Sequence, residues 1–111
     1  MNKETEKKIQ QLQLIEQNLH NIIMQKQAFQ MQLAEDENAM KELDKTSKNA
    51  YKIIGTIMVS SSREELKKEL KEQKDILDLR IKSLEKQENN FKEKAEEIQK
   101  EVMKDIKWVT N

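Results

Sequence analysis

Apolar residues recur at alternating steps of three and four through the first half of the sequence, and this spacing constrains the fold most. The positions are Leu12, Ile15, Leu19, Ile22, Lys26, Phe29, Leu33, Asp36, Met40 and Leu43, and eight of these ten are apolar. Such a repeat is typical of a coiled-coil helix. Lys26 and Asp36 are the polar exceptions, and polar residues in an apolar seam help to fix its register.

A single apolar column runs through the second half. Leu70, Leu77, Leu84, Phe91 and Ile98 lie seven residues apart. The alternate column is mostly polar, whereas a few apolar residues lie one place later and widen the stripe. The alternate column consists of Leu66, Gln73, Arg80, Gln87, Lys94 and Glu101, and the later residues are Ile81, Ala95 and Val102. We therefore expect one strong apolar line on this helix and a slender coiled coil.

Composition agrees with long helices and excludes several functions. Of the 111 residues 38% are charged, proline is absent and glycine occurs once, which is typical of coiled coils. The 21 basic and 21 acidic residues balance, which argues against nucleic-acid binding. Without cysteine there is no disulfide or thiolate chemistry. No apolar run reaches the ~18 residues of a membrane span, and no signal peptide is visible, so we expect a cytoplasmic protein with no membrane partner.

The two periodic segments predict one domain, residues 1–111, made of two helices of similar length at about 3–44 and 62–107. Either Ser61 with Glu64 or Ser62 with Glu65 forms a capping box at the start of the second helix. Equal amphipathic helices around a short connector favour an antiparallel helical hairpin. Folding back would bring Lys26 near Glu85 and Asp36 near Lys74, to within a turn.

Between the helices lies "AYKIIGTIMVSSS", which contains the only glycine and the densest β-branched run. It predicts a β-hairpin at about 50–60 that turns at Gly55; a continuous helix is the alternative. Adjacent aliphatic residues make both faces apolar, and a lone two-stranded hairpin is marginal in water. We therefore expect the hairpin to join an intersubunit β-barrel. Its assembly residues are Tyr51, Ile53, Ile54, Gly55, Ile57, Met58 and Val59.

Three segments together resemble the β-type subunits of archaeal prefoldins. "QLQLIEQNLHNIIMQKQAFQMQLAE" is similar to the glutamine-rich first helix of that family, "YKIIGTIMV" to its hairpin, and "LDLRIKSLEKQE" to its second helix. The resemblance implies an ATP-independent chaperone, a holdase, in a hexamer of two α-type and four β-type subunits. It also implies that the helix tips capture unfolded client proteins and pass them to a group II chaperonin.

Apolar residues near the free ends of the two helices are the candidate client-binding tips, because exposed apolar patches mark interaction sites. They are Leu12, Leu14, Ile15, Ile98, Val102, Met103, Ile106, Trp108 and Val109. In the alternative interpretation these residues only widen the seam or lie at a frayed end. Leu14, Ile23, Met24 and Met31 also fall off the first helix's stripe.

No catalytic, cofactor-binding or metal site is expected, and we predict that the protein is not an enzyme. His20 is the only histidine and lies beside the seam, facing outward. The acidic run from Glu35 to Glu37 lacks the spacing of a calcium loop, and a solvated helical face is the favoured interpretation. The rival function is a structural or tethering coiled coil that dimerises in parallel. A bZIP-like DNA-binding protein is a more distant alternative, because no basic stretch precedes a zipper.

Overall fold

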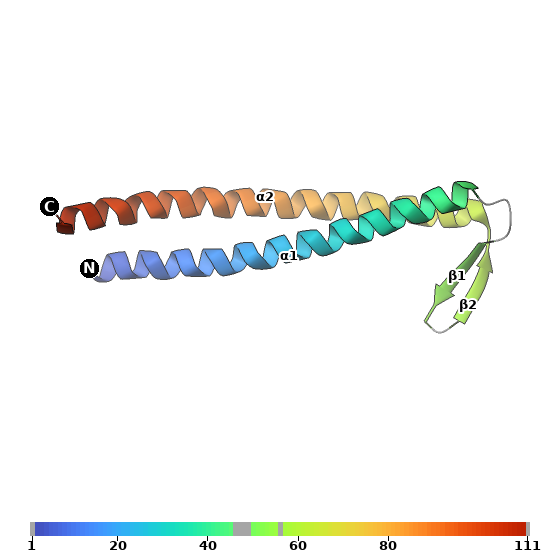
Figure 1. Cartoon of the computed structure of the whole chain (residues 1–111), viewed down its shortest axis with the longest axis horizontal. Helices are drawn as coiled ribbons and strands as arrows, with labels where there is room; N and C mark the ends of the chain where they lie inside the picture. The colour runs from blue at the N-terminus through green and yellow to red at the C-terminus, as the bar shows by residue number, and fades with distance from the viewer. Residues whose placement is uncertain (1, 46–49, 56, 111) are drawn as a thin grey trace. The chain divides into compact units, whose positions relative to one another are not determined.

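The computed structural model contains two long helices with one β-hairpin between them in the chain (Figure 1). Helix α1 spans Lys3–Lys45, β1 Ala50–Ile54, β2 Ile57–Ser61 and α2 Arg63–Thr110. The structure describes residues 2–45, 50–55 and 57–110; for 53, 54, 57, 59 and 107–110 it describes the backbone alone. The predicted fold class, a long antiparallel helical hairpin with a central β-hairpin, is confirmed.

The chain forms two compact units, and both helices run through both of them. One unit comprises Met1–Lys26 with Ser83–Asn111, and the other comprises Gln27–Lys82 with the hairpin. In the first unit Lys8 contacts Asp105 at 3.2 Å and Lys26 contacts Glu88 at 3.0 Å. A residue later in α1 therefore pairs with a residue earlier in α2, which shows that the two helices run antiparallel in this unit.

In the second unit, Gln27–Lys82, the two helices also pair antiparallel. Glu37 contacts Lys74 at 3.5 Å, and Asp44 forms an ion pair with Lys67. Arg63, the first residue of α2, donates a hydrogen bond to the carbonyl oxygen of Asp44 at 3.3 Å. Within each unit the seam is therefore filled by the chain's own two helices, which is unlike the parallel dimer of the tethering alternative.

The seam of α1 agrees with its sequence pattern. All ten of the predicted positions from Leu12 to Leu43 are buried or half-buried, with Ile15 and Ile22 the most buried apolar members. The repeat also extends one heptad towards the N-terminus, where Thr5 is buried and Lys8 half-buried. Heptad spacing thus identified the inward face of α1, including its two polar members.

The second column of α2 differs from the expectation of one apolar line. Gln73, Arg80, Gln87, Lys94 and Glu101 are all exposed, and the residues one place later face inward instead. That inward column is Lys74, Ile81, Glu88, Ala95 and Val102, of which Ile81, Glu88 and Val102 are buried. Together with Leu70, Leu77, Leu84, Phe91 and Ile98 it forms a regular coiled-coil repeat. Two of its members, Lys74 and Glu88, are charged, which concealed the column in the sequence.

Charged seam residues find partners slightly displaced from the predicted ones. Lys26 binds Glu88, one turn beyond Glu85, and Lys74 binds Glu37 rather than its neighbour Asp36. Asp36 is itself buried, so the interpretation of the acidic run from Glu35 to Glu37 as a fully solvated face is wrong at its central residue. The shift from Glu85 to Glu88 lies within the one turn allowed by the prediction.

At the start of α2, Ser62 provides the cap. The backbone N–H of Glu65 donates to Ser62 Oγ at 3.2 Å, and the N–H of Leu66 donates to the Ser62 carbonyl at 3.1 Å. A serine hydroxyl in this position satisfies a first-turn amide that has no partner within the helix. Of the two candidate capping serines, Ser62 accepts from the amide of Glu65, while the Glu65 carboxylate accepts a hydrogen bond from Ser61 Oγ at 3.4 Å.

The β-hairpin has antiparallel register, with Ala50 opposite Ser61 at its base and Ile54 opposite Ile57 at its turn. Gly55 follows Ile54 with a φ angle of 61°, the left-handed region that glycine adopts without steric cost. Glycine with a positive φ is favoured at the first position of a two-residue connection, because it suits the twist of the flanking strands. The lone glycine therefore stands where the turn needs it.

Candidate functional site

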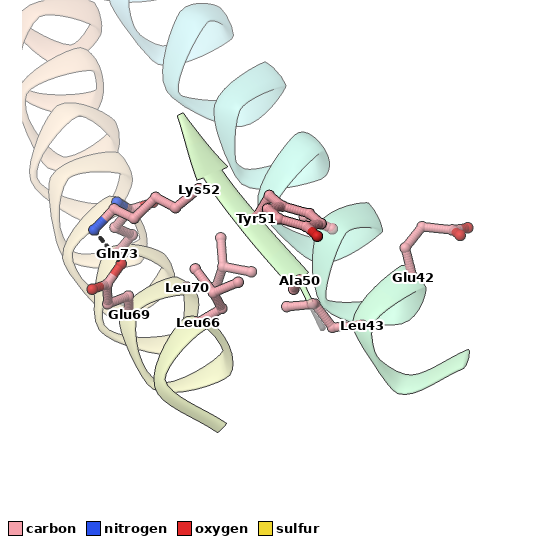
Figure 2. Close-up of a pocket in the computed structure, with 10 residues that line it drawn as sticks. Glu42, Leu43, Ala50, Tyr51, Lys52, Leu66, Glu69, Leu70 and Gln73 are labelled. Atoms are coloured by element: carbon pink, nitrogen blue, oxygen red, sulfur yellow. Dashed lines mark hydrogen bonds and ion pairs between the residues drawn. The ribbon is translucent and has the colours of Figure 1, made fainter. Parts of the chain in front are cut away.

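Strand β1 and the adjoining helix ends line a groove in the second unit (Figure 2). Its volume is about 510 Å³. The lining residues come from the end of α1, from β1 and from the start of α2: Ala39, Glu42, Leu43, Ala50, Tyr51, Lys52, Leu66, Glu69, Leu70 and Gln73. Lys52 on β1 forms an ion pair with Glu69 on α2 at 2.8 Å and ties the strand to the helix.

The two faces of the hairpin have different surroundings. Ala50, Lys52 and Ser61 share one face by register and are half-buried, and Lys52 reaches α2 from it. Tyr51 and Met58 share the opposite face and are 62% and 65% exposed. The chain's own helices therefore cover part of one face. On the other face Met58 and Tyr51 are largely exposed, although Tyr51 also borders the groove.

Among the predicted assembly residues, Tyr51, Gly55 and Met58 are exposed. The backbone of Ile53 pairs with that of Met58, Ile54 with Ile57, and Lys52 with Val59. The side chains of Ile53, Ile54, Ile57 and Val59 lie outside the described residues. The register nevertheless brings all seven predicted assembly residues into one two-stranded sheet with its turn.

In the other unit, the helix ends are held by a polar cluster that the sequence interpretation missed. Asn2 caps α1, because its Oδ1 accepts from both the N–H and the Oγ–H of Thr5 at 2.8 Å. Thr5 Oγ also lies 3.0 Å from Asp105 Oδ2, so its single proton is shared between the Asn2 and Asp105 oxygens, and Lys8 Nζ contacts the same Asp105 oxygen. These bonds join the start of α1 to the last turns of α2. The sequence did contain one sign of this cluster, because the heptad repeat of α1 continues towards the N-terminus to Thr5 and Lys8.

Hydrogen bonding in this cluster shifts two pKa values. The pKa of Asp105 lies below its ordinary value because Thr5 donates a hydrogen bond to the carboxylate and Lys8 adds a second bond and a positive charge. The pKa of Lys8 is raised, chiefly by its hydrogen bond to Asp105. Both shifts favour the charged forms, so the cluster is an ion pair at neutral pH.

The predicted tip residues separate into seam and surface. Ile15 and Val102 are buried, and Leu12 and Ile98 are half-buried, so these four belong to the seam. Leu14, Met103 and Ile106 are exposed. The side chains of Trp108 and Val109 lie outside the described residues.

Further exposed apolar side chains lie along the flanks of the helices. Met24 is exposed in the first unit, and Met31, Ile76 and Leu79 are exposed in the second. The sequence pattern had set Met24 and Met31 off the seam but gave no role to Ile76 and Leu79. Their positions outside the α2 repeat were the available signal.

The part of the chain that the structure describes contains neither a metal-ligand cluster nor a membrane-spanning helix. No three His, Cys, Asp or Glu side chains there are grouped to hold a metal ion. His20 is exposed beside Glu16, Gln17 and Asn21. No described helix is both long and apolar enough to cross a bilayer.

The architecture defines a class of coiled-coil protein in which antiparallel helices carry one β-hairpin at their connection. The sequence model of the prefoldin subunit family matches residues 6–107, and the chain belongs to the prefoldin family.

Relatives and a solved structure agree with this assignment. Prefoldin subunit beta of Pyrococcus furiosus is 35% identical over 94 residues, which are 83% of this chain and 80% of that protein. The same subunit of Thermococcus onnurineus is 34% identical over 94 residues, covering 83% and 81%. The crystal structure of the prefoldin beta subunit from Thermococcus strain KS-1 superposes with a TM-score of 0.87 at 28% identity, covering 93% of this chain and 92% of that one.

Proposed function

We propose that the chain is a β-type prefoldin subunit that works as an ATP-independent holdase. Its hairpin joins a hexamer of two α-type and four β-type subunits, and its helix tips capture non-native proteins. The observation that carries the proposal is the open face of the hairpin at Tyr51 and Met58, in a chain whose family consists of prefoldin subunits.

Assembly through the hairpin follows from the needs of a two-stranded sheet. Each strand has a neighbour on one side only, so each edge carries backbone groups that a strand from another subunit can pair with. Exposed Tyr51 and Met58 add apolar area to such a junction, and aromatic residues and methionine are enriched at protein interfaces. The hairpin thus provides both the hydrogen bonds and the apolar contact that a shared β-barrel requires.

Client capture at the tips rests on the exposure of Leu14, Met103 and Ile106. Unfolded polypeptides expose apolar side chains, and flexible methionine adapts to varied partners. Each buried contact contributes only ~1–2 kcal/mol, so one tip binds weakly. Several tips on one platform bind avidly, because the later contacts become intramolecular.

The remaining parts of the proposal follow from the family. We also propose that residues 1–111 act as a single domain, because one family model spans residues 6–107. The subunit is not an enzyme, works in the cytoplasm and passes its clients to a group II chaperonin.

Changing the tip surface without breaking the seam tests client capture. Leu14→Gln, Met103→Gln and Ile106→Gln together should leave assembly intact and reduce suppression of the aggregation of a chemically denatured test protein. A control with Met24→Gln and Met31→Gln changes exposed apolar residues away from the tips. Truncation after Glu97 should abolish suppression. Full suppression by the triple variant, at equal concentration of assembled complex, would contradict tip binding.

Charge placed in the hairpin tests assembly. Ile54→Asp with Ile57→Asp puts two carboxylates at paired positions of the sheet, and burial of an unpaired charge costs several kcal/mol. Native mass measurement after mixing with an α-type subunit should then show no hexamer. A control with Gln10→Asp and Gln17→Asp adds the same charge at exposed sites of α1 and should assemble. A hexamer of the hairpin variant at wild-type concentrations would refute the role of the hairpin.

A further inference from the structure

The seam of the first unit ends in a layer of three polar side chains, Thr5 and Lys8 of α1 and Asp105 of α2, which we call the tip latch. Thr5 is only 2% exposed, and its Oγ lies 3.0 Å from Asp105 Oδ2. Lys8 Nζ donates to the same oxygen at 3.2 Å. The chain has no cysteine, so no disulfide joins the helices. Noncovalent contacts alone therefore hold the two helix ends together.

The hydroxyl of Thr5 has one proton and two acceptors within reach. One acceptor is Oδ1 of Asn2, the residue that caps α1, at 2.8 Å, and the other is Asp105 Oδ2 on α2. When the helix ends separate, the hydroxyl donates to Asn2 alone and stays paired. The side chains of Lys8 and Asp105 are already 27% and 33% exposed, so water replaces their contact. Opening therefore leaves none of these polar groups unpaired, which removes the usual cost of breaking a buried polar layer.

Apolar seam residues lie directly behind the tip latch. Val102, three residues before Asp105 in α2, is 8% exposed, and Leu12 and Ile98 are half-buried. They have the same chemistry as the exposed apolar residues of the tips, but they face the other helix. Helix ends open locally at low free energy, and binding elements are commonly drawn from such weakly held regions. Opening of the tip latch thus uncovers Val102 first.

We propose that the tip latch controls a concealed client-binding surface made of Leu12, Ile98 and Val102. In the closed state these side chains pack in the seam, and in the open state they contact apolar side chains of a non-native protein. The inference rests on the proposed function and deepens it, because it makes part of client capture depend on separation of the helix ends. The closed state also reduces the apolar area that a chain without a client exposes to water.

Opening is measured on the full chain without a client. Val102→Cys introduces the only thiol, and its rate of reaction with iodoacetamide reports how often position 102 is exposed. Asp105→Ala removes the acceptor that Thr5 and Lys8 share, and should raise this rate about tenfold, because hydrogen bonds to charged groups contribute at least that factor. The matched control is Asp75→Ala, which removes an exposed carboxylate elsewhere on α2 and should leave the rate unchanged.

A thiol deeper in the same unit separates local opening from general loosening. Ile22 is 7% exposed in the seam, and the rate at Ile22→Cys should stay the same when Asp105→Ala is added. An unchanged rate at Val102→Cys, or an equal rise at Ile22→Cys, overturns the tip latch.

The client step is tested with a protein that stays unfolded because its cysteines have been carboxymethylated. This protein should slow the reaction of Val102→Cys in the Asp105→Ala background. Asp105→Ala should also suppress the aggregation of a denatured test protein at a lower concentration than the wild type. Thr5→Leu with Asp105→Leu closes the same layer with apolar side chains, and should suppress less although the chain becomes more apolar.

The outcomes distinguish the concealed surface from the holdase function itself. If the unfolded protein does not protect Val102→Cys, or if the leucine variant suppresses as well as the wild type, the concealed surface is refuted. If the wild type suppresses no aggregation, the holdase proposal is refuted, while the iodoacetamide rates still decide whether the tip latch opens.

Discussion

Removing the ammonium of Lys26 should destabilise the first unit. Lys26 Nζ donates to both carboxylate oxygens of Glu88, at 3.0 and 3.3 Å. The side chains of Lys26 and Glu88 are only 20% and 9% exposed. In Lys26→Met the stem keeps its packing, but Glu88 loses both hydrogen bonds. Its remaining cation is Lys92, at 3.9 Å and mostly exposed.

Breaking a fully buried ion pair costs about 3–5 kcal/mol, because the partner's charge stays desolvated. The residual exposure of Lys26 and the nearby Lys92 reduce this cost, so we expect Lys26→Met to lower the free energy of unfolding by about 2–3 kcal/mol. Replacing both residues removes the stranded charge. Lys26→Met with Glu88→Met should therefore return to within about 1 kcal/mol of the wild type, or exceed it.

Urea unfolding of the full chain at one protein concentration measures these differences. The control is Lys45→Met, whose partner Glu42 lies at 4.0 Å with both side chains more than three-quarters exposed; it should cost less than about 0.5 kcal/mol. The reasoning is refuted if Lys26→Met costs no more than this control. It is also refuted if the double variant is as unstable as the single one.

Three further predictions concern other parts of the chain. The ion pairs Lys8–Asp105 and Lys26–Glu88 lie on either side, and from them we infer that Leu19 lies opposite Ala95. Leu19→Cys with Ala95→Cys should therefore oxidise within one chain, and non-reducing mass analysis at low concentration should find no interchain dimer. Gly55→Ala should lower the free energy of unfolding in urea by about 1 kcal/mol. The cost comes from the backbone φ of 61°, because nothing lies within 4 Å of an added Cβ. Gly55→Asn should cost less, and equal losses of stability in the two variants would contradict the backbone argument. The pKa of Asp105 is lowered by folding. The ionised carboxylate therefore stabilises the folded chain fully above about pH 4, and this stabilisation is lost as the pH falls through the lowered pKa. An NMR titration of the Thr5 amide should show this transition, and Asp105→Asn should lack it.

Much of the fold could be predicted because heptad spacing reports burial directly. The seam of α1 was readable even through Lys26 and Asp36, since apolar residues on both sides kept the phase. On α2 the charged members Lys74 and Glu88 interrupted the second column, and a search for apolar residues alone placed it one residue too early. The seam tolerates these two charges because each forms an ion pair with a residue of α1. The sequence of α2 alone does not show which residue of α1 lies opposite.

The candidate surfaces were less accessible to sequence reasoning. β-branched residues around Gly55 predicted the hairpin, but not that its Lys52 face would be tied to α2 while Tyr51 and Met58 stayed open. Likewise Ile15 and Val102 carry the same apolar chemistry as Leu14 and Met103. Near the tips, seam residues differ from surface residues only in which side of the helix faces the other helix.

The two unpaired edges of the β1–β2 sheet have a consequence for the supply of this chain in the cell. Until another strand pairs with them, these edges and exposed Tyr51 and Met58 are a template for any extended segment, including another copy's hairpin. We expect copies made in excess of their assembly partners to self-associate through the hairpin or to be degraded. A chain that protects other proteins from aggregation would then itself depend on balanced synthesis with its partners.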